Sequence, residues 1–343
     1  MTRRPFMSES RRIVVVQYLR GIASLAVAWF HLTNSYGADG IGPVGFYGWL
    51  GVDVFFVISG LVIPYSLWNS EVPYRVQGFT KFLSRRVVRL EPPYLASIVL
   101  VIALWYLSAA APGFRGTHPS QDSYQVMFHL FYLIPLTRYE WLQPVYWSLA
   151  YEFAFYIAVG LAYPILTEKN HIGIWLFSSI GLSAAVMLGF LPDPILLFVI
   201  GISLFRNIAA LEHPGVSILI ASLAATAIAL SGSPQVALVG LLTAAAIKVG
   251  RWVELRDFLG KLLFFLGTIS YSLYLTHVPI GGRVVNLGSR FIDGKFEQFF
   301  LSVLALATSI AFAWIFYVVI ERRSLEISRH LFRKPQISKV AAQ

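Results

Sequence analysis

The sequence contains no cysteine and few charged residues. The absence of cysteine excludes disulfide bonds, thiolate nucleophiles, cysteine-ligated metal sites and S-acylation of the chain. Asp, Glu, Lys and Arg make up only 13% of the residues, whereas hydrophobic residues make up 57%. A soluble chain of 343 residues has too small a core to bury so many apolar side chains, but a lipid bilayer accepts them. The composition therefore predicts an all-α integral membrane protein.

The sequence also lacks the basic stretch interleaved with aromatic residues that is typical of a nucleic-acid-binding groove. The formal net charge is +10, but most of the cationic residues lie in short segments between apolar runs. Cations in such segments set the orientation of the helices and contact anionic lipid headgroups. We therefore expect membrane lipids, and not nucleic acid, among the partners.

About ten apolar runs are long enough to cross a bilayer, at about 20 residues for ~30 Å of hydrocarbon. They are residues 13–34, 47–68, 90–110, 144–166, 172–191, 194–211, 215–231, 234–250, 258–281 and 297–320. We expect the first run to be a retained helix and not a cleaved signal peptide, because Arg20 lies inside it and no small-residue cleavage pattern follows. The apolar stretch 126–136 is too short to span, so we expect it to lie at the interface or to re-enter the membrane.

The distribution of basic residues favours an orientation with both termini in the cytoplasm. Most of the 27 Lys and Arg residues then lie on the inner side, as the positive-inside rule requires. The exception is the last outer loop, which carries Arg283, Arg290 and Lys295. We expect a cytoplasmic segment at 1–12, a ten-helix membrane core at 13–321 and a basic cytoplasmic tail at 322–343.

Two ionisable residues, Arg20 and His31, lie inside the first apolar run. Their spacing of eleven residues is slightly more than three helical turns, so both side chains share one face, about 16 Å apart along the axis. An ionisable group inside a bilayer costs about 3 kcal/mol unless it is paired or hydrated, so it marks a functional site by default. The structural alternative is an arginine that reaches the inner interface and a histidine at the outer one.

Polar side chains on three other expected helices lie at depths that suggest convergence with His31 in the outer half of the bundle. They are Asp53 on the second helix, Ser148 and Glu152 on the fourth, and Tyr271, Tyr274 and His277 on the ninth. A carboxylate beside a histidine raises its basicity and fixes its tautomer, which a general base acting on a hydroxyl requires. We therefore predict a catalytic group of His31, Asp53, Glu152 and His277, with Ser148, Tyr271 and Tyr274 contacting the substrate.

Three arginines, Arg85, Arg86 and Arg89, lie at the inner start of the third apolar run. Arg86 and Arg89 are three residues apart and share a face if the segment is helical. Because guanidinium groups bind phosphates with paired hydrogen bonds, a phosphorylated cytoplasmic ligand could dock there. Ordinary positive-inside charges explain the spacing equally well.

Several segments, taken together and in order, resemble the acyltransferase-3 family of membrane O-acyltransferases from Tyr18 to Glu321. The segments are Tyr18-Leu-Arg-Gly-Ile-Ala leading through Arg20 to His31, Gly51-Val-Asp-Val-Phe-Phe-Val-Ile-Ser-Gly, Arg85-Arg-Val-Val-Arg-Leu-Glu-Pro-Pro-Tyr, Tyr146-Trp-Ser-Leu-Ala-Tyr-Glu-Phe-Ala-Phe-Tyr, Ser270-Tyr-Ser-Leu-Tyr-Leu-Thr-His and Tyr317-Val-Val-Ile-Glu. One departure is Arg323, which stands where a proline is usual after the closing segment.

The resemblance implies a ten-helix core that takes an acyl group, often acetyl, from cytoplasmic acyl-CoA. The acceptor it implies is a carbohydrate or glycolipid at or beyond the far face of a cell membrane, here a bacterial inner membrane. His31 would be the essential histidine, and Arg20, Arg86 and Arg89 the important arginines, with Arg85 beside them. Some relatives carry an appended soluble domain. None is expected here, so the core completes the transfer itself or works with a separate extracytoplasmic partner protein.

Two other functions fit some of the same residues. A proton- or substrate-coupled transporter also places histidines and carboxylates inside the membrane, but the sequence shows no paired discontinuous helices in matching halves. Other membrane-bound O-acyltransferases also use a buried histidine, and the ordered segments argue against them. No metal cofactor is expected, because His31 and His277 have no recognisable third ligand.

Overall fold

The computed structural model describes residues 14–70, 73–112, 114, 118–120 and 122–331. Within these ranges the regular structure is entirely helical. The α-helices are α1 (Val14–Asn34), α2 (Gly42–Gly45), α3 (Gly51–Trp68), α4 (Phe79–Ala109), α5 (Ser123–Leu130), α6 (Trp147–Thr167), α7 (Ile172–Met187), α8 (Pro194–Ile208), α9 (Pro214–Leu230), α10 (Pro234–Gly250), α11 (Phe258–Thr268), α12 (Ser270–Gly288), α13 (Lys295–Phe316) and α14 (Arg322–Leu331).

Five helical segments are long and apolar enough to cross a membrane, and a sixth is formed if α11 and α12 count as one bent span. The five are Val14–Asn34, Gly42–Trp68, Val76–Ala109, Trp147–Thr167 and Lys295–Leu331. Four shorter apolar helices, α7 to α10, complete the helical bundle. The protein is therefore a multi-pass membrane protein. Residues 1–12 of the predicted cytoplasmic segment and 332–343 of the predicted tail lie outside the described residues.

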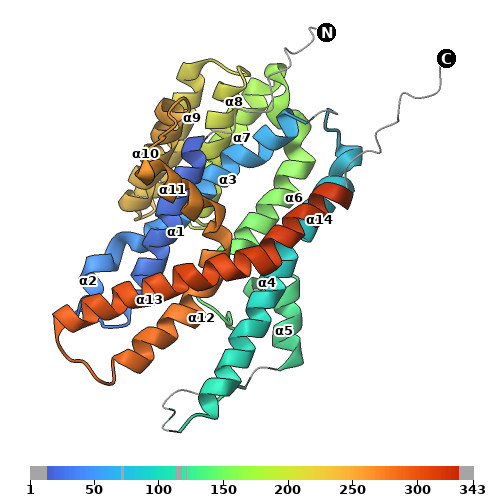
Figure 1. The fold of residues 1–343 in the computed structure, drawn as a ribbon. Helices are drawn as coiled ribbons and strands as arrows, with labels where there is room; N and C mark the ends of the chain where they lie inside the picture. Colours follow the sequence, from blue (N-terminus) through green and yellow to red (C-terminus); the bar gives the residue numbers. More distant parts are fainter. Residues whose placement is uncertain (1–13, 71–72, 113, 115–117, 121, 332–343) are drawn as a thin grey trace.

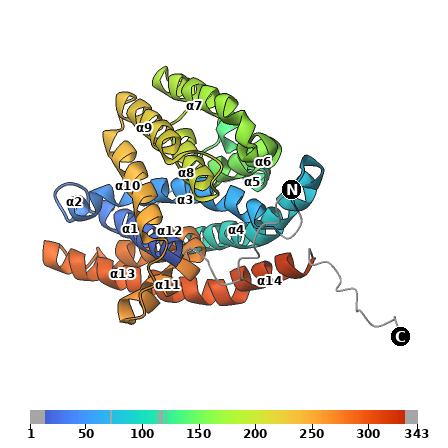
Figure 2. The ribbon, with the colours of Figure 1, turned by 90° about the horizontal axis from the view of Figure 1, so that it is seen from above.

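The helices form three groups when the bundle is viewed from above (Figure 2). Helices α7, α8 and α9 lie on one side, and α13 and α14 lie on the opposite side. Between them lie α1, α3, α4 and α12, which carry most of the polar residues predicted from the sequence. Figure 1 shows the helices from the side, where α13 and α14 follow each other in one line across the bundle.

Close contact between α3 and α8 depends on two glycines. A methyl group at Gly60 would overlap the carbonyl oxygen of Phe198, and one at Gly201 would overlap the carbonyl oxygen of Val57. Small residues of this kind allow helix backbones to approach in a membrane, where van der Waals packing drives association. This contact fixes α3, which forms one wall of the cavity described below.

The predicted span 258–281 is not a single straight helix in the structure. Helices α11 and α12 meet at Ile269 with an angle of 73°. The break gives α12 a new N-terminus, whose backbone N–H groups need acceptors outside the helix. Glu321 supplies one of them, because its Oε2 accepts hydrogen bonds from the backbone N–H of Ser272 (3.2 Å) and from its hydroxyl (2.5 Å).

Glu321 ends a π-helical turn, Tyr317–Glu321, that joins α13 to α14. The three elements form one helical segment from Lys295 to Leu331. A π turn inserts a residue into an α-helix and is frequent at functional sites. The first part of the predicted tail is thus a helix packed on the core, where the Ser328 hydroxyl donates to the Arg85 carbonyl oxygen at 2.9 Å.

Candidate active site

A cavity lies between the N-terminal halves of α1, α4, α6 and α12, is bordered by α3, and reaches the π turn. It encloses about 910 Å³ of empty space, counting the part that is open to solvent. Its charged lining residues are Arg20, Arg86, Arg89, Glu152 and Glu321. Residues far apart in the sequence therefore form one charged site inside a largely apolar bundle.

Two of the three cavity arginines are held by hydroxyl groups, and one of these two also by aromatic rings. Arg20 Nε donates to Ser270 Oγ at 3.2 Å, and Arg86 Nη2 donates to Ser66 Oγ at 3.0 Å. The Arg86 guanidinium also lies 5.6 Å from the centre of the Tyr156 ring. These contacts leave guanidinium N–H groups free to bind an anion.

Arg85 does not share this position. It is exposed on α4, beside α14, and is absent from the residues that line the cavity. Its side chain lies on a different face of α4 from the face that Arg86 and Arg89 share. The structure thus brings Arg20, Arg86 and Arg89 together and separates Arg85 from them.

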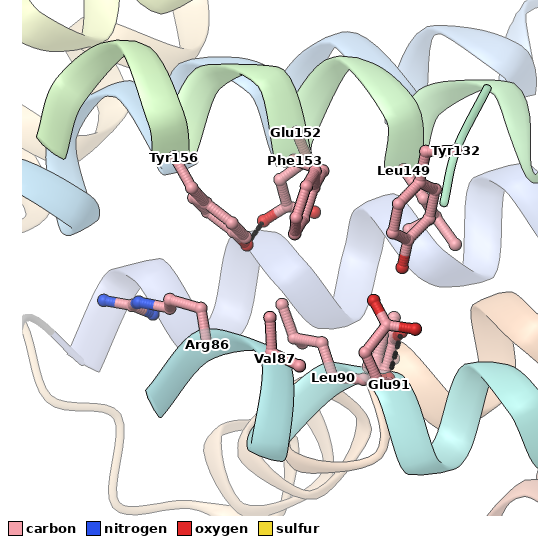
Figure 3. A pocket seen from close by; sticks show the side chains of 10 residues that line it. Arg86, Val87, Leu90, Glu91, Tyr132, Leu149, Glu152, Phe153 and Tyr156 are labelled. Atoms are coloured by element: carbon pink, nitrogen blue, oxygen red, sulfur yellow. Dashed lines mark hydrogen bonds between the residues drawn. The ribbon is translucent and has the colours of Figure 1, made fainter. Parts of the chain in front are cut away.

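The two cavity carboxylates are bonded to hydroxyl groups. Glu152 Oε1 accepts hydrogen bonds from the hydroxyls of Ser59 (3.2 Å) and Tyr156, and the Tyr156 contact is drawn in Figure 3. Glu321 accepts from Ser272. In the described part of the chain, no ion pair within 4.0 Å joins a cavity arginine to a cavity carboxylate. Three guanidinium groups thus face two carboxylates, which favours binding of an anionic ligand.

His31, in the last turn of α1, contacts His277, in the N-terminal half of α12. His277 Nε2 lies 3.3 Å from His31 Nδ1, and the ring centres are 5.2 Å apart. His277 Nδ1 lies 2.8 Å from the carbonyl oxygen of Leu273, which can only accept a hydrogen bond. In a neutral pair, His277 therefore has its proton on Nδ1, and the Nδ1 proton of His31 lies between two acceptors, His277 Nε2 and, at 3.2 Å, the carbonyl oxygen of Val27. This arrangement leaves His31 Nε2 with a free lone pair, as a general base requires.

Tyr274 connects the cavity to the histidine pair. Its side chain lines the cavity, and its ring centre lies 6.2 Å from that of His277. Its hydroxyl donates to the carbonyl oxygen of Val145 at 2.9 Å and lies 2.6 Å from Ser148 Oγ. Tyr271, one turn earlier on α12, also lines the cavity and donates to the carbonyl oxygen of Leu90 at 3.1 Å. Tyr271, Tyr274 and His277 thus form a polar stripe along α12.

Asp53 occupies a different environment from the one expected. It is buried in the first turn of α3, its Oδ2 has no hydrogen-bond partner, and the nearby charged group is Asp193. It is not among the residues that line the cavity. Glu152 lines the cavity with the arginines. The side chain that hydrogen-bonds to each histidine is the other histidine, and not a carboxylate. The roles of Asp53 and Glu152 in catalysis stay predictions.

Sequence reasoning missed several polar groups of the site. Ser59 and Tyr156 hold Glu152, and Tyr156 could have been found because it lies four residues after Glu152 on the same helix face. Ser270 and Ser66, which hold two of the arginines, carry no charge and have no equivalent signal. Glu91 lies in the arginine segment but was not singled out, and it lines a second cavity.

Comparison with known proteins assigns the chain to a family. A family model described as an acyltransferase domain matches residues 13–318. A protein of the Acidianus two-tailed virus named "Putative acetyltransferase ORF330" is 27% identical over 151 residues, which are 43% of this chain and 39% of that protein. "Protein 2 in picA locus" of Rhizobium radiobacter is 32% identical over 100 residues, 28% of this chain and 49% of that protein. The chain thus spans half or less of the length of these relatives.

No solved structure matches the chain. The family match covers most of the residues that the sequence segments indicated, including Arg20, His31, Glu152 and His277. It also covers all of the helices that line the cavity up to the π turn. The chain therefore belongs to this family of membrane acyltransferases.

Proposed function

We propose that the protein moves an acyl group from acyl-CoA, with acetyl-CoA as the first donor to test, to a hydroxyl of a carbohydrate or glycolipid. The observation that supports this proposal best is the cavity that gathers three arginines, without an ion pair to its two carboxylates, beside a paired histidine base. We further propose ten spans, with α7 to α10 counted among them, and both termini in the cytoplasm of a bacterial cell.

The donor's phosphates bind Arg20, Arg86 and Arg89, whose guanidinium forks match phosphate oxygens. Arg20 and His31 lie about 16 Å apart along α1, at about 1.5 Å per residue. The extended pantetheine arm follows this direction past Tyr274 and brings the thioester to the histidine pair. The charged half of the donor stays at the inner side, while the reacting bond lies in the outer half.

The reaction uses the free lone pair of His31 Nε2. As the acceptor oxygen attacks the thioester carbonyl carbon, Nε2 takes the hydroxyl proton, and the carbon–sulfur bond breaks. The departing CoA thiolate then takes the proton from His31, which restores the neutral pair. In an alternative sequence His31 first accepts the acyl group and then passes it to the hydroxyl. Mass spectrometry of protein incubated with the donor alone distinguishes the two, because only the second leaves an acyl adduct on His31.

The test is transfer of radiolabelled acetyl from acetyl-CoA to cell-envelope carbohydrate in membranes that carry wild type, His31→Ala or His330→Ala. His330 is an exposed residue on α14 and serves as the matched control. We expect label with wild type and His330→Ala, and a loss of roughly 10²- to 10⁴-fold with His31→Ala at equal expression. Equal labelling by all three would remove His31 from the reaction. A purified protein that consumes no acetyl-CoA would favour transport over acyl transfer.

A further inference from the structure

The cavity that holds the three arginines ends before it reaches the histidine pair. Neither His31 nor His277 is among its lining residues. His277 is completely buried. His31 is half-buried, and its accessible part lies outside the cavity, because the residue does not line it. The proposed reaction therefore requires the thioester to pass a barrier that is closed in this structure.

The direct route from Arg20 to His31 along α1 is filled by packed side chains. The residues between them on their shared face are not exposed at all. They are Ser24, Val27 and Ala28. The start of α3 lies against α1 at this level, where a methyl group at Gly51 would overlap the carbonyl oxygen of Ala23. Contact between two helix backbones does not open by rotation of a side chain, so the donor must cross the barrier at another point.

Two aromatic side chains close the cavity near His277. Phe55 of α3 and Tyr274 of α12 both line the cavity, and their ring centres are 6.0 Å apart with the planes inclined by 71°. The ring centre of Tyr274 also lies 6.2 Å from that of His277. Tyr274 therefore separates the cavity from His277, and Phe55 packs edge-on against it.

Hydrogen bonds hold the Tyr274 ring in this position. Its hydroxyl donates to the carbonyl oxygen of Val145 at 2.9 Å and lies 2.6 Å from Ser148 Oγ, which lines the cavity from α6. Ser148 also donates to the carbonyl oxygen of Val145, at 3.1 Å. These bonds join neutral groups, each of which contributes little net stability, so a bound ligand can displace them. The Phe55 side chain has no polar atom and is restrained by packing alone.

We propose that Phe55 and Tyr274 form a gate between the donor cavity and the histidine pair, which the acyl end of the donor opens and whose width favours small acyl groups. This proposal rests on the proposed acyl transfer. Phosphates bound at the cavity arginines hold the donor while its acyl end occupies the passage, and this occupancy stabilises the open state. Without a donor, the closed rings separate the cavity from the accessible side of His31.

The test follows the acyl end of a donor analogue to the histidine pair. The chain contains no cysteine, so His31→Cys introduces a single thiol. In full-length protein in nanodiscs, this thiolate attacks the methylene carbon of bromoacetyl-CoA, the carbon–bromine bond breaks and bromide leaves, so the CoA thioester stays attached. Intact-protein mass spectrometry gives the rate. Only the part of the rate that excess desulfo-CoA suppresses is counted, because this part depends on the donor site.

The gate variants Phe55→Ala, Phe55→Trp and Tyr274→Phe are made in the His31→Cys protein. Val62→Ala is the matched control, since Val62 lines the same cavity seven residues further along α3. We expect the rate to rise roughly 10-fold with Phe55→Ala, to fall roughly 10-fold with Phe55→Trp and to stay within about twofold with Val62→Ala. Tyr274→Phe removes the hydrogen bonds and keeps the ring, so the rate should rise roughly 2- to 10-fold.

A bulkier probe tests the width of the gate. With 4-(bromomethyl)benzoyl-CoA, the rise caused by Phe55→Ala should be larger than with bromoacetyl-CoA, on the order of 100-fold, because the added ring must pass the same two side chains. An equal rise with both probes would overturn the selection of small acyl groups. Iodoacetamide labels the same thiol from the accessible side of residue 31, so its rate should be equal in all variants that are correctly folded.

Unchanged bromoacetyl-CoA rates in both Phe55 variants, at equal iodoacetamide rates, would overturn the gate. If Phe55→Ala disturbs the fold and alters the iodoacetamide rate, Tyr274→Phe decides the question, and an unchanged rate in that variant overturns the gate as well. A thiol that reacts with iodoacetamide but with neither CoA probe in any variant would instead remove the proposed function, because the donor then never reaches the histidine pair.

Discussion

Arginine and glutamate side chains lie near each other at two places inside the bundle, and they form an ion pair at the first of these but not at the second. At the junction of α8 and α9, Arg206 Nε donates to Glu212 Oε2 at 2.7 Å, and both side chains are fully buried. Ser217 donates to the other oxygen of Glu212 at 2.6 Å, and a second guanidinium nitrogen of Arg206 donates to the Leu166 carbonyl oxygen. In the cavity, Arg20, Arg86 and Arg89 form no such pairs with Glu152 or Glu321.

The difference shows that burial of a charge does not by itself identify an active site. The two charges of the Arg206 pair neutralise each other, although Arg206 Nη2 is buried without a hydrogen-bond partner, so the effect of the pair is on folding. The cavity arginines keep free donors in a space that a ligand can enter. Variants of the two sites should therefore separate stability from activity.

The largest effect is expected from Arg206→Ala. Removal of one partner leaves the Glu212 carboxylate buried without its counter-charge, which costs about 3–5 kcal/mol of stability. The measurement is the thermal unfolding midpoint in detergent. The double variant Arg206→Leu with Glu212→Leu should recover most of the loss, because it removes both charges. An unchanged midpoint in Arg206→Ala would show that the pair is not a closed structural unit.

Arg86→Ala and Arg89→Ala should each have the opposite pattern. Loss of one charge-assisted contact to the donor phosphates should raise the KM for acetyl-CoA by roughly 10- to 100-fold, with little change in the unfolding midpoint. Arg85→Ala is the matched control, since Arg85 lies outside the cavity lining. If Arg85→Ala raised the KM for acetyl-CoA as strongly, the donor phosphates could not be assigned to the face that Arg86 and Arg89 share.

His277→Phe should lower kcat by roughly 10- to 100-fold without changing the KM for acetyl-CoA. Phenylalanine keeps the ring but removes one of the two acceptors near the Nδ1 proton of His31, and leaves only the Val27 carbonyl oxygen. His277→Gln should restore part of the rate, because the amide oxygen can accept that proton. Equal rates in the Phe and Gln variants would mean that His277 acts through packing alone.

Ser59→Ala is expected to have the smallest effect. The variant removes one of two hydroxyl groups that hold Glu152, and a neutral hydrogen bond is worth about 0.5–1.5 kcal/mol. The KM for acetyl-CoA should therefore change by roughly 2- to 10-fold, as measured by initial rates. A larger rise in the KM than in Arg89→Ala would show that Glu152 contributes more to donor binding than Arg89 does.

Helical periodicity predicted part of the candidate site from the sequence. It placed Arg20 and His31 on one face, and Arg86 and Arg89 on one face, and the structure brings Arg20, Arg86 and Arg89 into one cavity. The depth of a residue in its span was enough to pair His31 with His277. Helix-level properties, which depend on local sequence, were therefore accessible without the structure.

Properties that depend on helix rotation and on tertiary contacts were not accessible. Depth alone placed Asp53 with the histidines, whereas the structure buries it in the first turn of α3, outside the lining of the cavity. The Arg206–Glu212 pair was not predicted, because Glu212 lies beyond the end of α8 and only packing brings the two side chains together. The bend at Ile269 depends on Glu321, which is far along the chain and accepts from the N-terminus of α12.

The most direct test of the comparison is equilibrium binding of radiolabelled acetyl-CoA to the purified protein in nanodiscs. The samples are wild type, the double variant Arg86→Ala with Arg89→Ala, and the surface control Glu326→Gln. The cavity arginines predict binding by wild type and the control, and binding at least about 100-fold weaker in the double variant with an unchanged unfolding midpoint. Equal binding by all three proteins would contradict the placement of the donor in this cavity.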